Sequence, residues 1–180
     1  MATATPTPKT PAPPATRAAL IARQKKGVFA WERLEKGSHT AYADIYVMPP
    51  MDRAVLVKKG APSNMVGVIS REMDMTKERF VRIMGLSRAT VTRKMASNTD
   101  LSADESERLV GLAKLIGQVE TIVRQSGERA GFKPAKWFGE WIEQPAAALG
   151  GRKPEELLDT ADGREAVASL LAQMQSGAYA

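Results

Sequence analysis

The sequence of 180 residues contains no cysteine and a single histidine, His39. These absences exclude disulfide-stabilised folds, thiolate nucleophiles, and metal sites built from cysteine or clustered histidine. The sequence also has no run of about 18 apolar residues that could cross a bilayer, and residues 1–16 lack the apolar centre of a signal peptide. We therefore expect a cytoplasmic protein without a metal ion, a cofactor or a membrane contact.

Positive charge is present, and it is distributed unevenly along the chain. The formal net charge is +6. Residues 1–126 contain 20 Lys and Arg against 12 Asp and Glu, whereas residues 127–180 contain 6 against 8. Clustered cations neutralise phosphates and release counterions, so the first part predicts a nucleic-acid partner. A basic surface without such a partner is the alternative, and the acidic second part suggests a different partner.

Composition divides the chain into four regions. Residues 1–16 form a tail with five prolines and no large apolar residue after Met1, which predicts disorder. Residues 17–50 form a basic connector, with a weak helical pattern at first and a β-prone stretch at 42–47 before Pro49 and Pro50. We expect a helical domain over 51–126 and a second, C-terminal domain over 127–180.

From Met51 onward, the spacing of apolar residues is helical, and no strand alternation competes with it. We expect helices at about 52–59, 63–73, 76–84, 88–96, 102–125, 133–143 and 163–176. The sequence is therefore predicted to be all-α.

The helix at 102–125 is the clearest of these. Ser102 and Glu105 form the pattern of a capping box. The helix then carries apolar residues at spacings of 3, 4, 3 and 4, namely Leu109, Leu112, Ile116, Val119 and Val123. Such a stripe must be buried. Either it lies in the core of the chain or it forms a dimer interface.

Residues 76–96 have the pattern of a helix-turn-helix motif. Thr76 and Ser87 are suited to capping two short helices, and Gly85 is suited to ending the first one. The three residues 85–87 then form the turn between them. If Val91 and Met95 face inward, the second helix turns its other face to solvent. That face would contact the major groove, and the predicted DNA contacts are Arg88, Thr92, Arg93 and Lys94. A purely structural helix pair is the alternative.

The C-terminal part contains an ordered series of motifs. They are Trp141, Pro145, Leu149-Gly150-Gly151, Pro154, Thr160, Gly163, the apolar stretch 167–171 and the closing Gly177-Ala178-Tyr179-Ala180. With these motifs, residues 51–180 resemble the Xre antitoxins of RES–Xre toxin–antitoxin pairs. The C-terminal part of that family is the Xre/MbcA/ParS-type toxin-binding domain, and the upstream part is an Xre-like helix-turn-helix.

The resemblance implies an antitoxin that is not an enzyme and that covers the active-site cleft of a RES-domain toxin, which consumes NAD or uses it as an ADP-ribosyl donor. The toxin-binding residues that we expect are Trp141, Leu149, Gly150, Gly151, Arg152, Gly177, Tyr179 and Ala180. It also implies repression of the chain's own operon, with operator DNA and a second copy of the chain as partners. The alternative is a helix-turn-helix regulator whose C-terminal domain only dimerises.

Overall fold

The structure is a computed structural model that describes residues 30–36, 41–127 and 131–176. The predicted N-terminal tail, half of the basic connector and residues 177–180 lie outside this part. The described α-helices, besides a helical stretch at 30–35, are α2 (Ala41–Val47), α3 (Pro50–Lys59), α4 (Met65–Glu72), α5 (Lys77–Ile83), α6 (Arg88–Ala96), α7 (Ala103–Gln125), α8 (Pro134–Trp141) and α9 (Ala161–Ser176). Two 3₁₀ helices, η1 (Ala147–Leu149) and η2 (Pro154–Leu157), lie between α8 and α9. The described residues form no strand, only an isolated bridge between Pro62 and Asp100, so the all-α prediction is confirmed.

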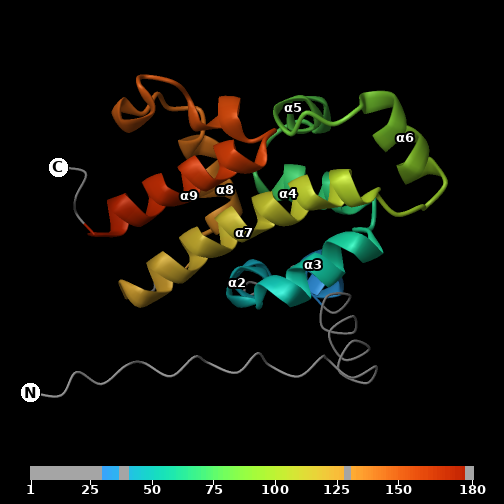
Figure 1. The fold of residues 1–180 in the computed structure, drawn as a ribbon, viewed down its shortest axis with the longest axis horizontal. Coiled ribbons are helices and arrows are strands. Elements are labelled where there is room, and N and C mark those ends of the chain that lie inside the picture. The colour runs from blue at the N-terminus through green and yellow to red at the C-terminus, as the bar shows by residue number, and fades with distance from the viewer. Residues whose placement is uncertain (1–29, 37–40, 128–130, 177–180) are drawn as a thin grey trace, which may run out of the picture.

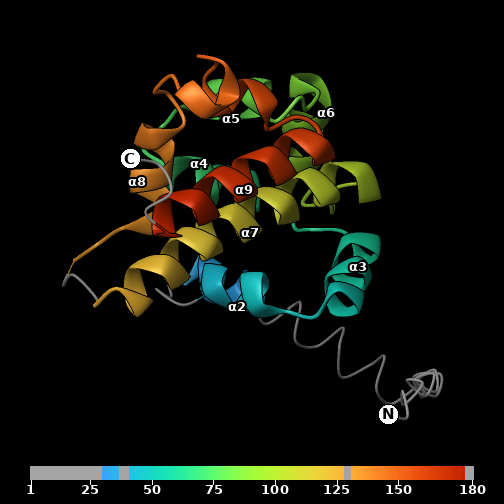
Figure 2. The same ribbon diagram turned by 60° about the vertical axis from the view of Figure 1, so that its left-hand side comes forward.

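Helix α7 is the centre of the fold. Helix α9 lies along one side of it and α2 crosses the other. Helix α4 lies behind it, α5 packs on α4, and α6 lies near the N-terminal end of α7 (Figures 1 and 2). The predicted capping box is present, since the Ser102 hydroxyl accepts a hydrogen bond from the Glu105 amide and the Glu105 carboxylate accepts one from the Ser102 amide. The apolar stripe of α7 is buried within the chain from Leu109 to Val119. Of the two interpretations of this stripe, the structure therefore shows the intrachain core.

Helix α2 corrects the expectation of a β-prone, irregular segment at 42–47. This helix forms because of contacts with α7, which the sequence of residues 42–47 alone does not reveal. Tyr42 and Ile45 are buried against α7, and the Glu120 carboxylate of α7 accepts a hydrogen bond at 2.9 Å from the Ala43 amide in the first turn of α2. A carboxylate at a helix N-terminus stabilises the helix. Burial raises the pKa of Glu120, although the Ala43 amide and Arg124 act in the opposite direction.

One hydrophobic core connects the α-helices. Phe80 and Met84 from α5 and its C-terminal end, Leu112 from α7, Phe138 from α8 and Leu171 from α9 belong to the same buried cluster. The helix-turn-helix region and the C-terminal region are therefore packed on each other and share their interior.

Helix α8 lies against the end of α4. A Cβ atom added to Gly139 would lie 2.3 Å from the backbone oxygen of Met73, so only glycine permits this approach without a shift. At the exposed edge of the same contact, the Lys136 ammonium lies 2.7 Å from the Asp74 carboxylate. The packing of α8 thus fixes the C-terminal region to the helix-turn-helix region.

Candidate functional site

The predicted helix-turn-helix is formed by α5, a short turn and α6. Its capping residues act as expected: the Thr76 hydroxyl accepts a hydrogen bond from the Arg79 amide at 3.2 Å, and the Ser87 hydroxyl accepts one from the Thr90 amide at 3.4 Å. Gly85 has a φ of 59°, the left-handed conformation that favours glycine. Arg108 of α7 donates hydrogen bonds to the Met84 and Gly85 carbonyls. The turn is therefore held directly by the central helix.

Helix α6 presents the face that the sequence predicts. Val91 is buried and Met95 is half-buried against the core. Arg88, Thr92 and Arg93 are exposed on the other side. The Arg88 guanidinium has only a long contact of 3.9 Å with Glu78, and both side chains are mostly exposed. These three polar side chains of α6 are therefore available to a ligand.

Lys94 has a different environment from the other three predicted DNA contacts. Its ammonium lies 2.5 Å from the Glu105 carboxylate of α7, and its side chain is largely buried. Burial raises the pKa of Glu105, but the bonds from Lys94 and Ser102 outweigh it, so the pKa is lowered overall. Lys94 thus links α6 to α7, and it would have to exchange this bond to contact a phosphate.

Arg79 connects the helix-turn-helix to the C-terminal region. Its guanidinium contacts the Glu143 carboxylate after α8 and, at 2.6 Å, the Glu155 carboxylate of η2. Glu155 first, and then Glu143, raise the pKa of Arg79. Because planar guanidinium groups bond two carboxylates in a fixed geometry, this side chain sets how the segment from α8 to η2 lies on α5.

The predicted C-terminal contact residues lie on α8 and on the loop after it. Trp141 is half-buried and stacks on Trp137, with ring centroids 5.8 Å apart and an interplanar angle of 9°. In the loop, Gly150 and Gly151 have φ values of 66° and 81°. No atom lies within 4 Å of the place where a Cβ of either glycine would stand, and Arg152 is exposed. The loop is therefore open to a partner, whereas the predicted contacts Gly177, Tyr179 and Ala180 lie outside the described residues.

Sequence reasoning missed an apolar groove of about 610 Å³ at the ends of α7 and α9. Its walls include Ile122 of α7, Trp137 of α8 and Met174 of α9. A hydrogen bond of 3.1 Å from Gln175 to Gln125 joins the two helices beside it. The exposed Met174 at the end of an otherwise regular apolar stripe was the only sequence signal for this groove.

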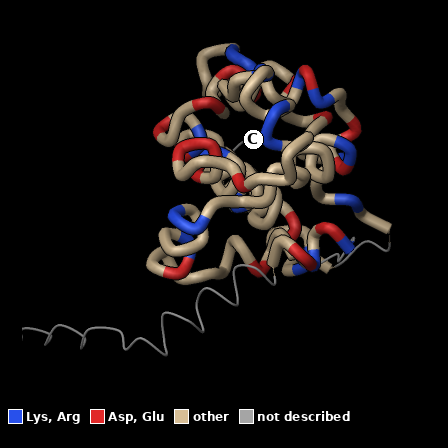
Figure 3. The backbone as a smooth tube through the Cα atoms, turned by 90° about the vertical axis from the view of Figure 1, so that its right-hand side faces the viewer, with Lys and Arg blue, Asp and Glu red and all other residues tan. Residues whose placement is uncertain are grey.

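Charge on the described surface is mixed. In the view that faces α6, basic and acidic positions lie among one another along the backbone (Figure 3). Residues 1–29, which are not described, contain five of the chain's Lys and Arg residues and none of its Asp and Glu residues. The basic excess predicted to favour nucleic acid thus resides largely in that segment. No described group of His, Asp and Glu could hold a metal ion, and no described helix is both long and apolar enough to traverse a bilayer.

Both the helix-turn-helix region and the C-terminal region match models of known protein families. Residues 52–114 match the family model of the antitoxin Xre-like helix-turn-helix domain, and residues 129–177 match that of the antitoxin Xre/MbcA/ParS C-terminal toxin-binding domain. The fold and its two surfaces therefore define a helix-turn-helix protein with a toxin-binding domain.

Relatives specify the family further. The chain is 41% identical over 140 residues to the Prs ADP-ribosylating antitoxin of Sphingobium sp. (strain YBL2), covering 78% of this chain and 88% of that protein. It is 23% identical over 122 residues to the antitoxin Xre of Photorhabdus laumondii, covering 68% and 77% of the two chains. The chain belongs to the Xre family of antitoxins.

Proposed function

We propose that this antitoxin neutralises a RES-domain toxin, an enzyme that consumes NAD, by covering its active-site cleft. The observation that carries the proposal is the match of residues 129–177, from before α8 to beyond α9, to a toxin-binding domain. The name of the Sphingobium relative supports the toxin's chemistry, because it refers to ADP-ribosylation, a reaction in which NAD is the donor.

In this proposal, two parts of the C-terminal domain have different tasks. The exposed loop at Leu149, Gly150, Gly151 and Arg152, together with Trp141, forms the docking surface. Residues 177–180 reach into the cleft and exclude NAD. The described geometry supports this division, because the bond between Gln175 and Gln125 holds the last turn of α9 and so fixes the point from which that tail starts.

The test is co-expression with the adjacent open reading frame, scoring growth, cellular NAD and co-purification. We expect the full chain to restore growth and NAD. A chain ending at Ser176 keeps the bond between Gln175 and Gln125, so it should still co-purify with the toxin but leave NAD low. If that shorter chain inhibits as well as the full chain, the tail does not act in the cleft. A neighbouring product that is harmless and does not bind would contradict the toxin assignment and favour a regulator without a toxin.

We further propose that the chain represses its own operon through α6. The support is the exposed face that carries Arg88, Thr92 and Arg93 on a helix whose N-terminus is capped by Ser87. Arginine makes bidentate contacts to guanine, and threonine contacts thymine methyl groups. A homodimer would place two such helices on a symmetric operator, and the basic residues before Ala30 would add phosphate contacts.

The double substitution Arg88→Ala and Arg93→Ala tests this second function. We expect it to weaken operator binding by at least tenfold, because each base contact contributes about 1–3 kcal/mol. The same variant should neutralise the toxin as well as the parent chain does, which shows that it is folded. Unchanged operator affinity and unchanged salt dependence would remove the assignment of α6 as the recognition helix.

A further inference from the structure

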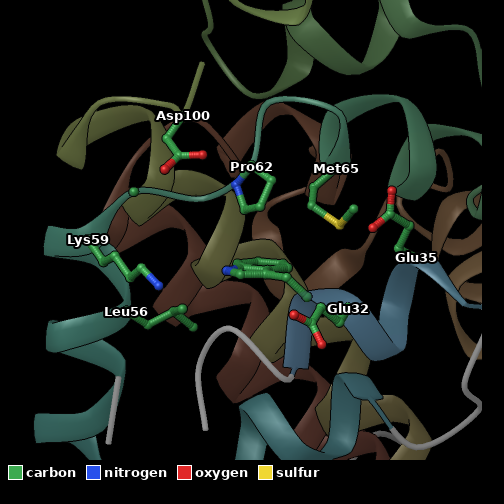
Figure 4. A pocket seen from close by; sticks show the side chains of 9 residues that line it. Glu32, Glu35, Leu56, Lys59, Pro62, Met65 and Asp100 are labelled. Carbon is green, nitrogen blue, oxygen red and sulfur yellow. The ribbon is translucent and has the colours of Figure 1, made fainter. Parts of the chain in front are cut away.

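A pocket of about 250 Å³ lies at the end of α3, on the opposite side of the fold from the C-terminal domain's loop. It is enclosed by the helical stretch 30–35, the loop from α3 to α4 and the loop from α6 to α7 (Figure 4). The lining includes Trp31, Glu32, Glu35, Leu56, Lys59 and Met65. None of these residues has a role in the proposed function, so the pocket requires a separate explanation.

Trp31 gives the first indication of a ligand. Its side chain is only 3% exposed, and its indole Nε1 is buried without a hydrogen-bond partner in the described part of the chain. An unpaired buried N–H costs about 1–3 kcal/mol. Since the residue lines the pocket, an occupant that offers an oxygen atom there would remove this cost.

The charged side chains of the pocket are placed on two sides. Lys59 and Asp100 lie on one side, and Glu32 and Glu35 lie on the other (Figure 4). Glu35 Oε1 accepts a hydrogen bond at 2.8 Å from the side-chain Nδ2 of Asn64, so its second carboxylate oxygen is left for a ligand. Among the described residues, no ion pair engages Glu32, Lys59 or Asp100. The pocket thus has three carboxylates and one ammonium group, which favours an occupant with a net positive charge. No described group of acidic residues is arranged to hold a metal ion, which argues against a metal ion as this occupant.

The walls of the pocket are held in place before any ligand binds. The Leu101 amide donates to the Ala61 carbonyl at 2.8 Å, and Pro62 and Asp100 form a β-bridge beside it. At Gly60, where φ is 95°, an added Cβ would lie 2.8 Å from the Leu101 oxygen. A preformed concave site with apolar walls and a few polar groups is the usual form of a small-molecule site.

We propose that this pocket binds a free basic amino acid or a close derivative of one. The ligand's carboxylate or carbonyl oxygen accepts from Trp31 Nε1 and Lys59 Nζ. Its ammonium or guanidinium group lies against the carboxylates of Glu32 and Glu35. Its aliphatic stem packs between Leu56 and Met65. This assignment goes beyond toxin neutralisation and operator binding, and it does not depend on either.

The test is calorimetric titration of the full chain with three probes. L-arginine has both the positive group and the carboxylate, agmatine lacks the carboxylate, and citrulline lacks the positive side chain. We expect saturable binding of one arginine per chain, and at least tenfold weaker binding of the other two probes. Failure of arginine to saturate at 10 mM, or equal affinity for all three probes, would overturn the proposal.

Variants locate the site. Lys59→Met and Glu32→Gln should each weaken arginine binding at least tenfold, and Trp31→Phe, which keeps an aromatic ring but removes the N–H, should weaken it as well. Lys58→Met is the matched control, because Lys58 is an exposed neighbour on α3 that does not line the pocket, and it should bind as the parent does. Equal effects of Lys58→Met and Lys59→Met would contradict the site. A further variant changes Arg23, Lys25 and Lys26 to Gln. If arginine binds only to this variant, the chain's own basic segment occupies the pocket, and the proposal of a free ligand is wrong.

Discussion

Replacing Gly139 with alanine tests whether the close packing of α8 on α4 joins the two domains. The new Cβ would lie 2.3 Å from the Met73 oxygen and 3.2 Å from the Met73 carbonyl carbon. Both are backbone atoms, so no side-chain rotation can relieve the contact. Overpacking of this kind costs about 1–3 kcal/mol or somewhat more, whereas alanine in a helix gains about 1 kcal/mol over glycine. Because a backbone contact at 2.3 Å belongs at the upper end of the overpacking range, we expect a net loss of about 1–2 kcal/mol in the free energy of unfolding.

The matched control is Gly67→Ala in α4. An added Cβ there would meet only the Met95 Cε at 3.5 Å and the Lys77 Cδ at 3.7 Å, which are ordinary contacts. This variant should be more stable than the parent by about 0.5–1 kcal/mol. Since 1 kcal/mol shifts the Tm of a chain of this size by about 2–4 °C, thermal unfolding followed by circular dichroism resolves the two variants in opposite directions. A Gly139→Ala protein as stable as the parent would refute the reasoning about this contact.

Three further substitutions test other parts of the fold. Burial first, and then the neighbouring Glu72, raise the pKa of Tyr42 well above its ordinary value of 10.0. At alkaline pH the folded chain therefore retains a proton that the unfolded chain releases. The free energy of unfolding should fall as the pH rises above about 10. Urea unfolding at several alkaline pH values should show a smaller loss for Tyr42→Phe, and equal losses in both proteins would contradict the assignment. Ser102→Ala removes the cap of α7 and should lower the free energy of unfolding by about 1 kcal/mol. Ser126→Ala at the other end of the helix serves as the comparison. Equal stability of the parent and Ser102→Ala would argue against the capping box. Arg79→Met leaves Glu155 and Glu143 without their shared partner. It should lower the free energy of unfolding by about 1–2 kcal/mol, because hydrogen bonds to charged groups contribute about 1.5–3 kcal/mol and this site is partly exposed. A denaturation midpoint that does not change would show that the ion pairs do not join the domains.

The helices from Met51 onward could be predicted because local signals and the apolar pattern agree. Ser102, Thr76 and Ser87 cap the helices that the sequence assigns to them, and Gly85 adopts the left-handed conformation expected at the turn. These features depend on residues within a few positions of one another. They are therefore visible in a single sequence.

Helix α2 could not be predicted in this way, because a distant carboxylate on α7 accepts a hydrogen bond from its first turn and its burial depends on the same helix. The bond from Lys94 to Glu105 shows a related limit: spacing places Lys94 near the outward face of α6, but only the tertiary structure shows that a carboxylate of the next helix already engages it. The pocket around Trp31 was equally invisible, since it brings together residues from both ends of the region 31–100.

The central position of α7 has a consequence for the lifetime of this protein in the cell. The second half of the helix, after residue 114, lies between the two regions that match family models, yet its side chains belong to the one core shared by both. Neither region can be removed without opening the interior of the other. A protease that degrades this chain would therefore dismantle both regions in a single event. Under the two proposed functions, operator binding and toxin binding would end together.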